Sequence, residues 1–421
     1  MLRCAAGCGT ARPRALGVDC APPTSSRLRV IVHGLTTLSA ATRTRVLAIM
    51  EAGSVTGPAK NLIAFGQWTR TPEGRASGIE LSVATYVRHG SGAGRGFLAA
   101  AQSAGLTTWE IPERGRFDRH AATELARVID RVDPQIVQTH NTKSHLFVKV
   151  SKFRRLRPWI AFQHGYLTTD LKLLLYNEVD RWTLPAASVV VSVCEAFTQR
   201  LLRYGVLPGR LRVLHNSAEP KPRAAPELLH ELRARLGVED SDAVIVTIGR
   251  MSREKGHAEL IEALHALPPT RRPWKLVLVG EGPERKRLES LVAQRGMAQR
   301  VVFAGYSTNI DEFYGIATLF VLPSHSEGSP NVILEAMAAS VPIVATAVGG
   351  TPEILRHEVT ALLPGSRDPR AMAQAIARLL NDEKEASELA RAALDDLRHR
   401  FSPAVYRDRL IEIYRSALVM S

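Results

Sequence analysis

Short apolar runs alternate with helix-like segments along most of this chain, and the alternation limits the folds that it can adopt. The apolar runs span 45–53, 79–87, 135–140, 159–165 and 187–193, and then 243–249, 275–280, 301–305, 319–323 and 342–346. Segments with helical spacing lie between them, such as 58–70, 120–132, 283–296 and 369–382. Short apolar strands separated by helices predict parallel sheets that are covered on both faces.

A stretch rich in proline and polar residues, "NSAEPKPRAAPE" at 216–227, divides this alternation into two halves. A chain of 421 residues also suggests two domains. We therefore predict two Rossmann-like, doubly wound domains, at 45–215 and 216–400, facing a central cleft. We expect residues 1–44 to be a disordered extension, because they show little periodicity, and 401–421 to form a helix that packs back on the first domain. Ligands of such sheets bind at the carboxyl ends of the strands.

The net charge of +14 is concentrated in the first half of the chain. Residues 1–210 carry 28 lysines and arginines and 14 acidic residues, whereas residues 211–421 carry 27 of each. An excess confined to one half indicates an anionic partner, such as a phosphate or an acidic membrane surface. The alternative is an arginine-rich proteome, but this would make both halves basic. Nucleic acid is not favoured, because no recognised binding module accompanies the charge.

Cysteine content and apolar run lengths restrict the setting in which the protein works. Four cysteines in 421 residues are too few for a disulfide framework, and Cys4, Cys8 and Cys20 have no fourth metal ligand nearby. No apolar run approaches the roughly 18 to 20 residues that span a bilayer. We therefore expect a reduced, cytoplasmic protein. The acidic triplet at 240–242 falls between the two halves and is interpreted as a solvated turn rather than a metal site.

Two cations follow the first strand of the second half, in "TIGRMSREKGH" at 247–257. Arg250 and Lys255 would lie at the carboxyl end of this strand, beside the start of a helix. Two cations in that position form an anion trap, and phosphate is the expected guest. Considered alone, the pair is also compatible with two solvated loop cations.

The stretch "EGSPNVILE" places Glu327 and Glu335 on either side of an expected helix start. Ser329 would cap this helix, and Pro330 would take its first position. Free N–H groups at a helix N-terminus bind a diphosphate, and each carboxylate can accept hydrogen bonds from a pair of vicinal hydroxyls. The alternative is a capping acid and a surface glutamate, which fits this stretch equally well.

The loops of the first half offer weaker signals. Gly53 and Gly57, in "EAGSVTGPAK", follow the first strand and would allow a ligand to approach the backbone closely. His140 and His164 end successive strands, and His164 is predicted to point into the cleft near the reacting centre. A structural role is the alternative for each histidine. The chain has no G-x-G-x-x-G or Walker A motif.

Taken together, these stretches resemble the retaining nucleotide-sugar glycosyltransferases of the GT-B fold, in the glycogen-synthase-like family four. The resemblance covers residues 45–420. It rests on "EGSPNVILEAMA", which is similar to the E-x7-E motif, and on "GRMSREKG", which is similar to the donor-phosphate loop. "LVGEGPERKRLE", "AVGGTPEIL" and "VLHNSAE" support it. The first-strand loop lacks the usual adjacent glycines, and the junction reads Asn216-Ser217 where Asn-Gly is usual.

The resemblance implies a role for each candidate residue. Arg250 and Lys255 would hold the donor diphosphate and neutralise the leaving group. Glu335 would bind the ribose, Glu327 the transferred sugar, and His164 would lie near the anomeric centre. The remaining implied residues of the donor site are Gly328, Ser329, Pro330, Asn331 and Tyr306, and those of the acceptor and phosphate loop are Gly53, Gly57 and His140. No metal or other cofactor is implied, because preorganised cations would stabilise the diphosphate.

The resulting hypothesis is a retaining hexosyltransferase that moves a sugar from a UDP- or GDP-sugar to a glycan or lipid-linked acceptor, in exopolysaccharide or envelope synthesis. The alternatives are a non-catalytic sugar-nucleotide-binding protein and a nucleotide-sugar epimerase or phosphorylase on the same fold. Residues 143–159 are predicted to form a basic amphipathic helix that contacts the anionic inner face of the cytoplasmic membrane. A helix that packs on the core is the alternative for this segment.

Overall fold

The computed structural model describes most of the chain after residue 42. The described residues are 43–52, 57–88, 94–115, 118–151, 153, 157–165, 171–220, 222 and 224–420, with the side chains of 171–175 left aside. Of the predicted N-terminal extension at 1–44, only residues 43 and 44 are described. Gly53, a predicted site residue, lies outside the described residues.

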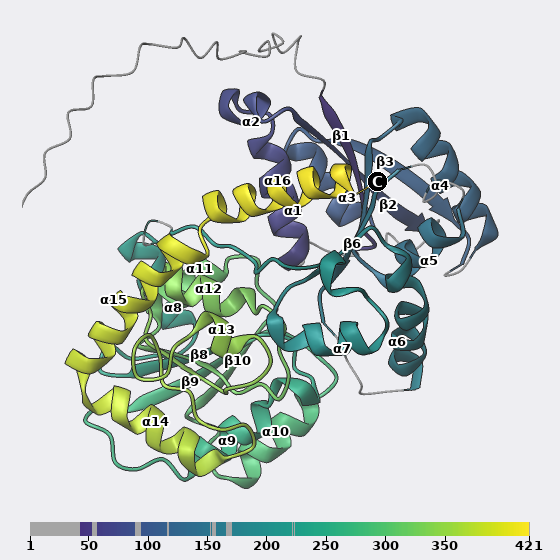
Figure 1. Cartoon of the computed structure of the whole chain (residues 1–421). Helices are drawn as coiled ribbons and strands as arrows, with labels where there is room; N and C mark the ends of the chain where they lie inside the picture. Colours follow the sequence, from purple (N-terminus) through teal and green to yellow (C-terminus); the bar gives the residue numbers. More distant parts are fainter. Residues whose placement is uncertain are drawn as a thin grey trace, which may run out of the picture. The chain divides into compact units, whose positions relative to one another are not determined.

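In the described residues of the first half, seven parallel strands form one sheet in the order β3-β2-β1-β4-β5-β6-β7 (Figure 1). The strands are β1 Thr44–Ile49, β2 Ile79–Arg88, β3 Thr107–Glu113, β4 Ile136–Thr139, β5 Trp159–Gln163, β6 Val189–Ser192 and β7 Leu211–Val213. The helices are α1 Gly57–Trp68, α2 Pro72–Ala76, α3 Arg95–Ser103, α4 Arg119–Val132, α5 Thr142–Val150, α6 Leu171–Thr183 and α7 Thr198–Arg203.

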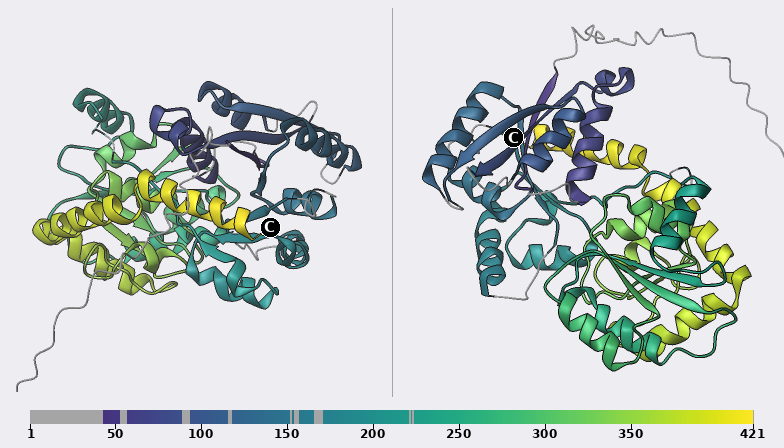
Figure 2. Two further views of the ribbon diagram at one scale, coloured as in Figure 1. Left: turned by 45° about the horizontal axis from the view of Figure 1, so that its top comes forward. Right: turned by 180° about the vertical axis from the view of Figure 1, so that it is seen from behind.

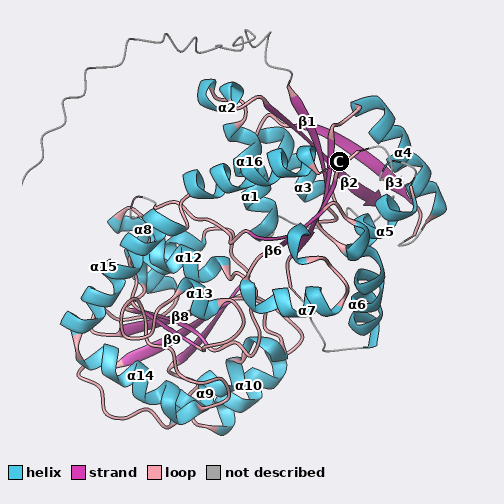
Figure 3. Cartoon of the chain, in the orientation of Figure 1, coloured by secondary structure: helices cyan, strands magenta, loops and turns pink. Residues whose placement is uncertain are grey.

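The described residues of the second half contain a five-stranded parallel sheet in the order β10-β9-β8-β11-β12. The strands are β8 Ala243–Ile248, β9 Trp274–Val279, β10 Val301–Gly305, β11 Leu319–Leu322 and β12 Ile343–Ala345. The helices are α8 Pro226–Arg235, α9 His257–His265, α10 Arg285–Gln294, α11 Ile310–Ile316, α12 Asn331–Ala338, α13 Thr351–Ile354, α14 Pro369–Asn381, α15 Glu383–Arg400 and α16 Pro403–Val419. Figure 3 shows helices on both sides of this sheet.

Each sheet buries both of its faces, which is why most residues of its central strands are apolar. Along β1, Val46 packs into one core cluster and the next residue, Leu47, into another on the opposite face. Along β8, Val244 and Ile245 likewise pack into core clusters on opposite faces of the sheet. Side chains of successive strand residues point to opposite faces, so two apolar helical layers are needed to cover each sheet.

The last two helices pack on different sheets. Ala393 and Leu397 of α15 belong to a core cluster of the five-stranded sheet. Leu410 and Tyr414 of α16 belong to a core cluster of the seven-stranded sheet, together with Val46 of β1. Figures 1 and 2 show α16, drawn in yellow, beside the purple helix α1 of the first half.

The predicted fold class is confirmed, and each of the ten predicted apolar runs overlaps a strand. The two strands that were not predicted, β3 and β7, are the edges of the seven-stranded sheet. An edge strand is covered less completely, so its sequence carries a weaker apolar signal. β3 includes Pro112 and has only two buried residues, Ile111 and Glu113, and β7 has only three half-buried residues.

The predicted basic amphipathic helix at 143–159 is wrong. The helix α5 ends at Val150, and Trp159 is a fully buried residue of β5. Lys143, which was expected to face the membrane, is 3% exposed and bonded to Glu113. The segment contains a helix and a strand that both pack in the core, so its apolar residues are buried against the sheet rather than exposed to a membrane. Lys152, Arg154 and Arg155 lie outside the described residues.

Candidate active site

The candidate site lies where the strand order of the five-stranded sheet reverses. From β8, the next strand in the chain, β9, lies on one side, and β11 lies on the other. Loops that leave two such neighbouring strands diverge, and open α/β sheets bind ligands in the crevice between them. Arg250 and Lys255 follow β8, and Glu327 follows β11, so the fold brings residues that are distant in sequence to one place.

Lys255 and Glu327 are in direct contact. Lys255 Nζ donates to Glu327 Oε1 over 2.7 Å, and Ser324 Oγ donates to the same oxygen over 2.6 Å. Glu327 is 8% exposed, whereas 26% of the Lys255 side chain is exposed. A buried carboxylate that accepts one charged and one neutral hydrogen bond is fixed in orientation. Sequence reasoning missed Ser324, although it lies only three residues before Glu327.

The start of α12 differs from the prediction. Ser329 does not cap the helix: Pro330 takes the N-cap position, and α12 begins at Asn331 without a side-chain cap. Ser329 Oγ instead accepts from the Asn216 N–H over 3.0 Å, while the Asn216 side chain donates to the Ser329 carbonyl over 2.7 Å. The prediction that Ser329 caps α12 is wrong, because its hydroxyl is hydrogen-bonded to Asn216 in the segment that joins the two sheets. N–H groups at the start of α12 therefore have no side-chain acceptor among the described residues.

Glu335 lies on α12, after the helix start as predicted, and is bound by two groups. Lys60 Nζ of α1 lies 2.8 Å from Glu335 Oε1, and the Tyr314 hydroxyl donates to Oε2 over 3.3 Å. Burial, reinforced by the charge of Glu335, raises the pKa of Tyr314 well above its usual range, so its hydroxyl remains a donor. A ribose that bound Glu335 would share or replace these two partners.

Two of the predicted glycines lie in close contact with distant segments. A Cβ atom on Gly57 would lie 2.5 Å from Nδ2 of Asn331. A Cβ atom on Gly328 would lie 3.0 Å from the His164 carbonyl oxygen and 3.0 Å from the Val193 side chain. The loop that carries Glu327 therefore packs directly against residues that follow β5 and β6.

Arg250 and Tyr306 follow β8 and β10, and both are exposed. Tyr306 is 72% exposed and lines a pocket together with residues of α8 and α11. Among the described interactions, neither side chain is bonded to Lys255 or Glu327. The structure therefore brings together Lys255, Glu327 and the start of α12, but it does not connect Tyr306 to them.

The two predicted histidines follow β4 and β5 and form a pair. His140 Nδ1 lies 2.9 Å from His164 Nε2, and the rings are stacked with an interplanar angle of 7°. Burial lowers the pKa of His140 well below its usual range and that of His164 to about 3, with nearby histidines adding to both shifts. Both rings are therefore neutral near neutral pH.

A second charged cluster lies at the carboxyl edge of the seven-stranded sheet. Lys143 Nζ lies 3.0 Å from Glu51 Oε1 and 2.7 Å from Glu113 Oε2, and Arg88 is 3.1 Å from the other oxygen of Glu113. Glu51 follows β1 and Lys143 follows β4, and the strand order reverses between these two strands. Sequence reasoning missed this cluster, although the position of both residues after the two reversing strands was a usable signal.

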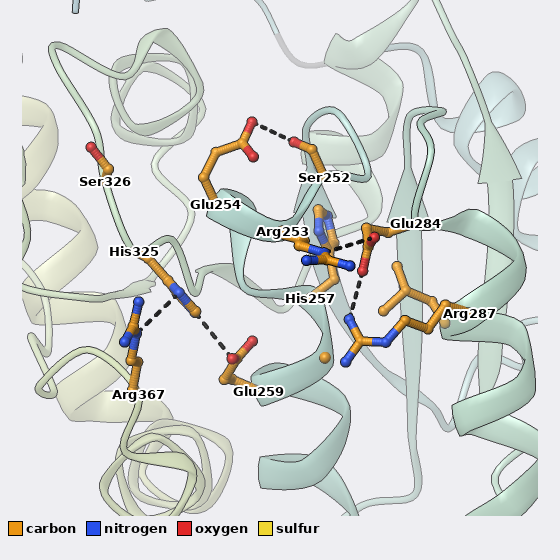
Figure 4. Close-up of a pocket in the computed structure, with 12 residues that line it drawn as sticks. Ser252, Arg253, Glu254, His257, Glu259, Glu284, Arg287, His325, Ser326 and Arg367 are labelled. Carbon is orange, nitrogen blue, oxygen red and sulfur yellow. Dashed lines mark hydrogen bonds and ion pairs between the residues drawn. The ribbon is translucent and has the colours of Figure 1, made fainter. Parts of the chain in front are cut away.

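A pocket of about 740 Å³ adjoins the loop that carries Lys255 (Figure 4). Its lining residues include His325, which lies between Glu259 at 3.2 Å and Arg367 at 3.4 Å. His257 also lines the pocket and is 3% exposed. Burial, with the charge of Lys255 as a smaller cause, lowers the pKa of His257 to about 4.

Two features are not found among the described residues. None of the helices among them is long and apolar enough to span a membrane. No group of three or more His, Cys, Asp or Glu side chains among them is placed to hold a metal ion. Asp240 is exposed, as expected of a turn, whereas Asp242 is buried and accepts from the Glu239 N–H over 2.9 Å.

The two sheets with a site at a strand-order reversal define the two-domain GT-B class. In agreement, the Anabaena protein Alr3699/HepE, crystallised with UDP and glucose, aligns with a TM-score of 0.75 at 21% identity, over 89% of this chain and 100% of that one. Residues 230–396 match the family described as Glycosyl transferases group 1, and residues 73–221 match Glycosyltransferase Family 4.

Curated relatives extend this finding. The alpha-maltose-1-phosphate synthase of Mycolicibacterium smegmatis is 32% identical over 286 residues, which is 62% of this chain and 70% of that protein. The lipopolysaccharide core biosynthesis glycosyltransferase LpsD of Rhizobium meliloti is 33% identical over 204 residues, or 48% of this chain and 57% of LpsD. Several curated relatives are matched over only about half of their length. The chain belongs to the group 1, family-four-like glycosyltransferases.

Proposed function

We propose that the protein is a retaining glycosyltransferase that moves a sugar from a nucleoside-diphosphate sugar to a hydroxyl group of a glycan or lipid-linked acceptor. The observation that carries the proposal is the 2.7 Å contact between Lys255 and Glu327 beside the uncapped start of α12. This arrangement supplies positive potential for a diphosphate and a carboxylate for sugar hydroxyls. Family membership supports the same reaction class.

The chemistry follows from where charge develops. Cleavage of the bond between the anomeric carbon and the diphosphate leaves negative charge on the diphosphate. Lys255 and the first N–H groups of α12 are held in place before the reaction, so they would stabilise this charge without reorganisation. Arg250, which is exposed and follows β8, is proposed to add a second cation. Glu327 Oε1 is occupied by Lys255 and Ser324, which leaves Oε2 to accept from the hydroxyls of the transferred sugar. In this proposal the protein's own groups stabilise the charge on the diphosphate, and no metal ion is included.

The donor is proposed to be a UDP- or GDP-sugar. Alr3699/HepE, crystallised with UDP, supports UDP as the first candidate. Glu335, between Lys60 and Tyr314, is the proposed ribose contact, and exposed Tyr306 is proposed to select the base. A thermal-shift panel of UDP, GDP and ADP tests this, since a ligand at 100 times its Kd stabilises by about 2.7 kcal/mol. Equal shifts with all three nucleotides would contradict selection of a base.

The acceptor is proposed to bind at the carboxyl edge of the seven-stranded sheet. Glu51 and His140 follow the two strands between which the order reverses, and Glu51 is 34% exposed. The relative LpsD is named for lipopolysaccharide core biosynthesis, which supports a glycan of the cell envelope as the acceptor. A carboxylate at the edge of the site can accept hydrogen bonds from such a polyhydroxyl molecule.

Peripheral contact with an anionic membrane is also proposed, through exposed side chains near Trp182 rather than through the basic helix that was expected at 143–159. Val150 at the end of α5 and Trp182 on α6 are 60% and 55% exposed. Lys149 Nζ lies 3.4 Å from the centroid of the Trp182 ring. An exposed tryptophan next to a lysine suits the interface of an anionic leaflet. Co-sedimentation with anionic liposomes should weaken in Trp182→Ala and not in the control Leu207→Ala, and no binding by the wild type at low salt would remove this proposal.

The transfer reaction itself is tested with purified full-length protein, nucleotide sugars and glycan acceptors. Glu327→Ala and Lys255→Ala should each lower turnover at least a hundredfold, whereas Lys384→Ala and Glu388→Ala, on the exposed face of α15, should not. NMR analysis of the product should show the same anomeric configuration as the donor.

The alternatives give different results in the same assay. Nucleotide binding without turnover of the donor would indicate a non-catalytic sugar-nucleotide-binding protein. An epimerised donor, or phosphate-dependent release of a sugar phosphate, would indicate an epimerase or a phosphorylase. Unchanged turnover in both Glu327→Ala and Lys255→Ala would remove the assignment of this site.

A further inference from the structure

A chain of buried hydrogen bonds connects the C-terminal helix to the histidine pair. The Tyr414 hydroxyl of α16 donates to Gln138 Oε1 of β4 over 2.6 Å. Gln138 Nε2 lies 2.6 Å from His140 Nε2, and His140 Nδ1 lies 2.9 Å from His164 Nε2. Tyr414 and Gln138 are fully buried, and His140 is 8% exposed. Four side chains, from α16, from β4 and from the loops that follow β4 and β5, thus form one series of hydrogen bonds.

The order of donors along the series follows from Tyr414. Burial raises the pKa of its phenol well above the usual range, so the hydroxyl keeps its proton and donates to Gln138 Oε1. The amide nitrogen of Gln138 must then face His140 and donate to Nε2. With Nε2 an acceptor, a neutral His140 carries its proton on Nδ1 and donates to Nε2 of His164. A neutral His164 therefore carries its own proton on Nδ1.

The opposite order leaves a buried donor unpaired inside the core. If the Gln138 amide were reversed, its nitrogen would donate to the Tyr414 oxygen, and the Tyr414 proton would have no acceptor among the described residues. An unsatisfied buried donor costs about 1–3 kcal/mol. The order that begins at Tyr414 satisfies every member except the last, His164 Nδ1, which is buried and has no partner in the described residues.

The unpaired N–H lies on a residue that touches the candidate active site. The backbone carbonyl of His164 packs against Gly328, the residue after Glu327. We propose that Tyr414 and Gln138 are positioning residues, which fix the tautomers of His140 and His164 so that His164 offers a neutral Nδ1–H donor to an oxygen of the bound glycosyl donor. The ligand part of this inference rests on the proposed function, whereas the tautomer part concerns the protein alone.

The tautomers are measured directly in the full-length, ligand-free protein. Long-range proton–nitrogen NMR of histidine labelled with ¹⁵N distinguishes a protonated ring nitrogen from an unprotonated one. His140→Gln and His164→Gln assign the signals among the 13 histidines. Wild-type protein should show both His140 and His164 protonated on Nδ1. An unprotonated His164 Nδ1 would overturn the inference.

Two substitutions should change the tautomers in different ways. Tyr414→Phe releases the Gln138 amide, so both tautomers of each histidine should appear. Gln138→Glu replaces the amide donor by a carboxylate, which accepts from His140 Nε2–H and should reverse the series, moving the His164 proton to Nε2. Tyr406→Phe, at a half-buried tyrosine of α16 outside the series, is the control and should leave the tautomers unchanged.

Kinetics complete the test and separate the two proposals. If His164 Nδ1–H binds the glycosyl donor, Tyr414→Phe and Gln138→Glu should lower kcat/KM about tenfold or more, in proportion to the population of the changed tautomer. A changed tautomer with unchanged kcat/KM, or unchanged tautomers in folded Tyr414→Phe and Gln138→Glu, would overturn the inference. The predicted tautomers in a protein without transferase activity would instead count against the proposed function alone.

Discussion

Each sheet carries a lysine–glutamate pair where its strand order reverses, and the two pairs differ in their contact with water. In the first sheet, Lys143 is 3% exposed and contacts two carboxylates, Glu51 and Glu113. In the second, Lys255 keeps 26% exposure and contacts one carboxylate, Glu327. A lysine enclosed by two acids has its charge fully compensated, whereas a partly solvated one retains positive potential for a ligand. We therefore expect the buried Lys143–Glu113 contact to contribute mainly to stability, and we propose that the Lys255–Glu327 pair binds a ligand.

The largest expected effect is on stability at the first pair. Lys143→Met should lower the free energy of unfolding by roughly 3–5 kcal/mol, because it leaves the buried Glu113 carboxylate with only Arg88 as a partner. Urea denaturation followed by circular dichroism measures this. A loss below about 1 kcal/mol would mean that the pair is not a structural element.

The second prediction concerns the other lysine and activity. Lys255→Met should lower kcat about 10²–10³-fold, since it removes a preorganised cation from the proposed leaving group. Its free energy of unfolding should fall much less than that of Lys143→Met, because Lys255 already contacts water. Initial rates and urea denaturation on the same preparations check both statements. The comparison fails if Lys255→Met loses stability as strongly as Lys143→Met.

The third prediction is a pH dependence that arises in the second domain. His257 has a pKa of about 4 in the folded protein and about 6.5 when unfolded, so below pH 6.5 the unfolded state takes up a proton that the folded state does not. Stability is unaffected above pH 6.5 and falls as the pH drops toward 4. At pH 5 the loss from this residue is roughly 2 kcal/mol. The difference in unfolding free energy between pH 7 and pH 5 should shrink by this amount in His257→Gln, and an unchanged difference would contradict the shift.

The smallest expected effect is at the exposed ion pair between the two halves. Lys60 is 48% exposed, and its contact with Glu335 is screened by water and salt. Lys60→Met should therefore change the free energy of unfolding by less than about 1 kcal/mol, and the change should shrink further at 0.5 M NaCl. Thermal melts at low and high salt provide the measurement. A large, salt-independent loss would show that Lys60 behaves like Lys143.

The sequence was sufficient for the parts of the fold that depend on local pattern. The apolar runs 243–249 and 319–323 became β8 and β11, and the spacing of Arg250, Lys255, Glu327 and Glu335 placed them on the loops and the helix that the structure shows. Both edge strands escaped prediction because few of their residues are buried: two of seven in β3 and none of the three in β7. Residues 143–159 were misassigned, because an apolar core segment with cations beside it has the same pattern as a membrane-facing helix.

Contacts between distant segments were not encoded in any local pattern. Ser329 has the residue type of a helix cap, but Asn216, more than a hundred residues away, competes for its hydroxyl. The sequence around Tyr414 carries no signal for a partner, and only the packing of α16 on β4 brings its hydroxyl to Gln138. Which partner a polar group takes depends on which groups folding leaves beside it without water.

The sequence by itself determined the two parallel sheets, the positions of the charged loops after their strands, and the family. Tertiary structure decided which of these charges are buried together, that the Ser329 hydroxyl pairs with Asn216 instead of capping α12, and that Tyr414 lies beside Gln138. The physical reason is that strand and helix periodicity are read within about ten residues, whereas desolvation and hydrogen-bond pairing act between side chains that become neighbours only in the folded chain.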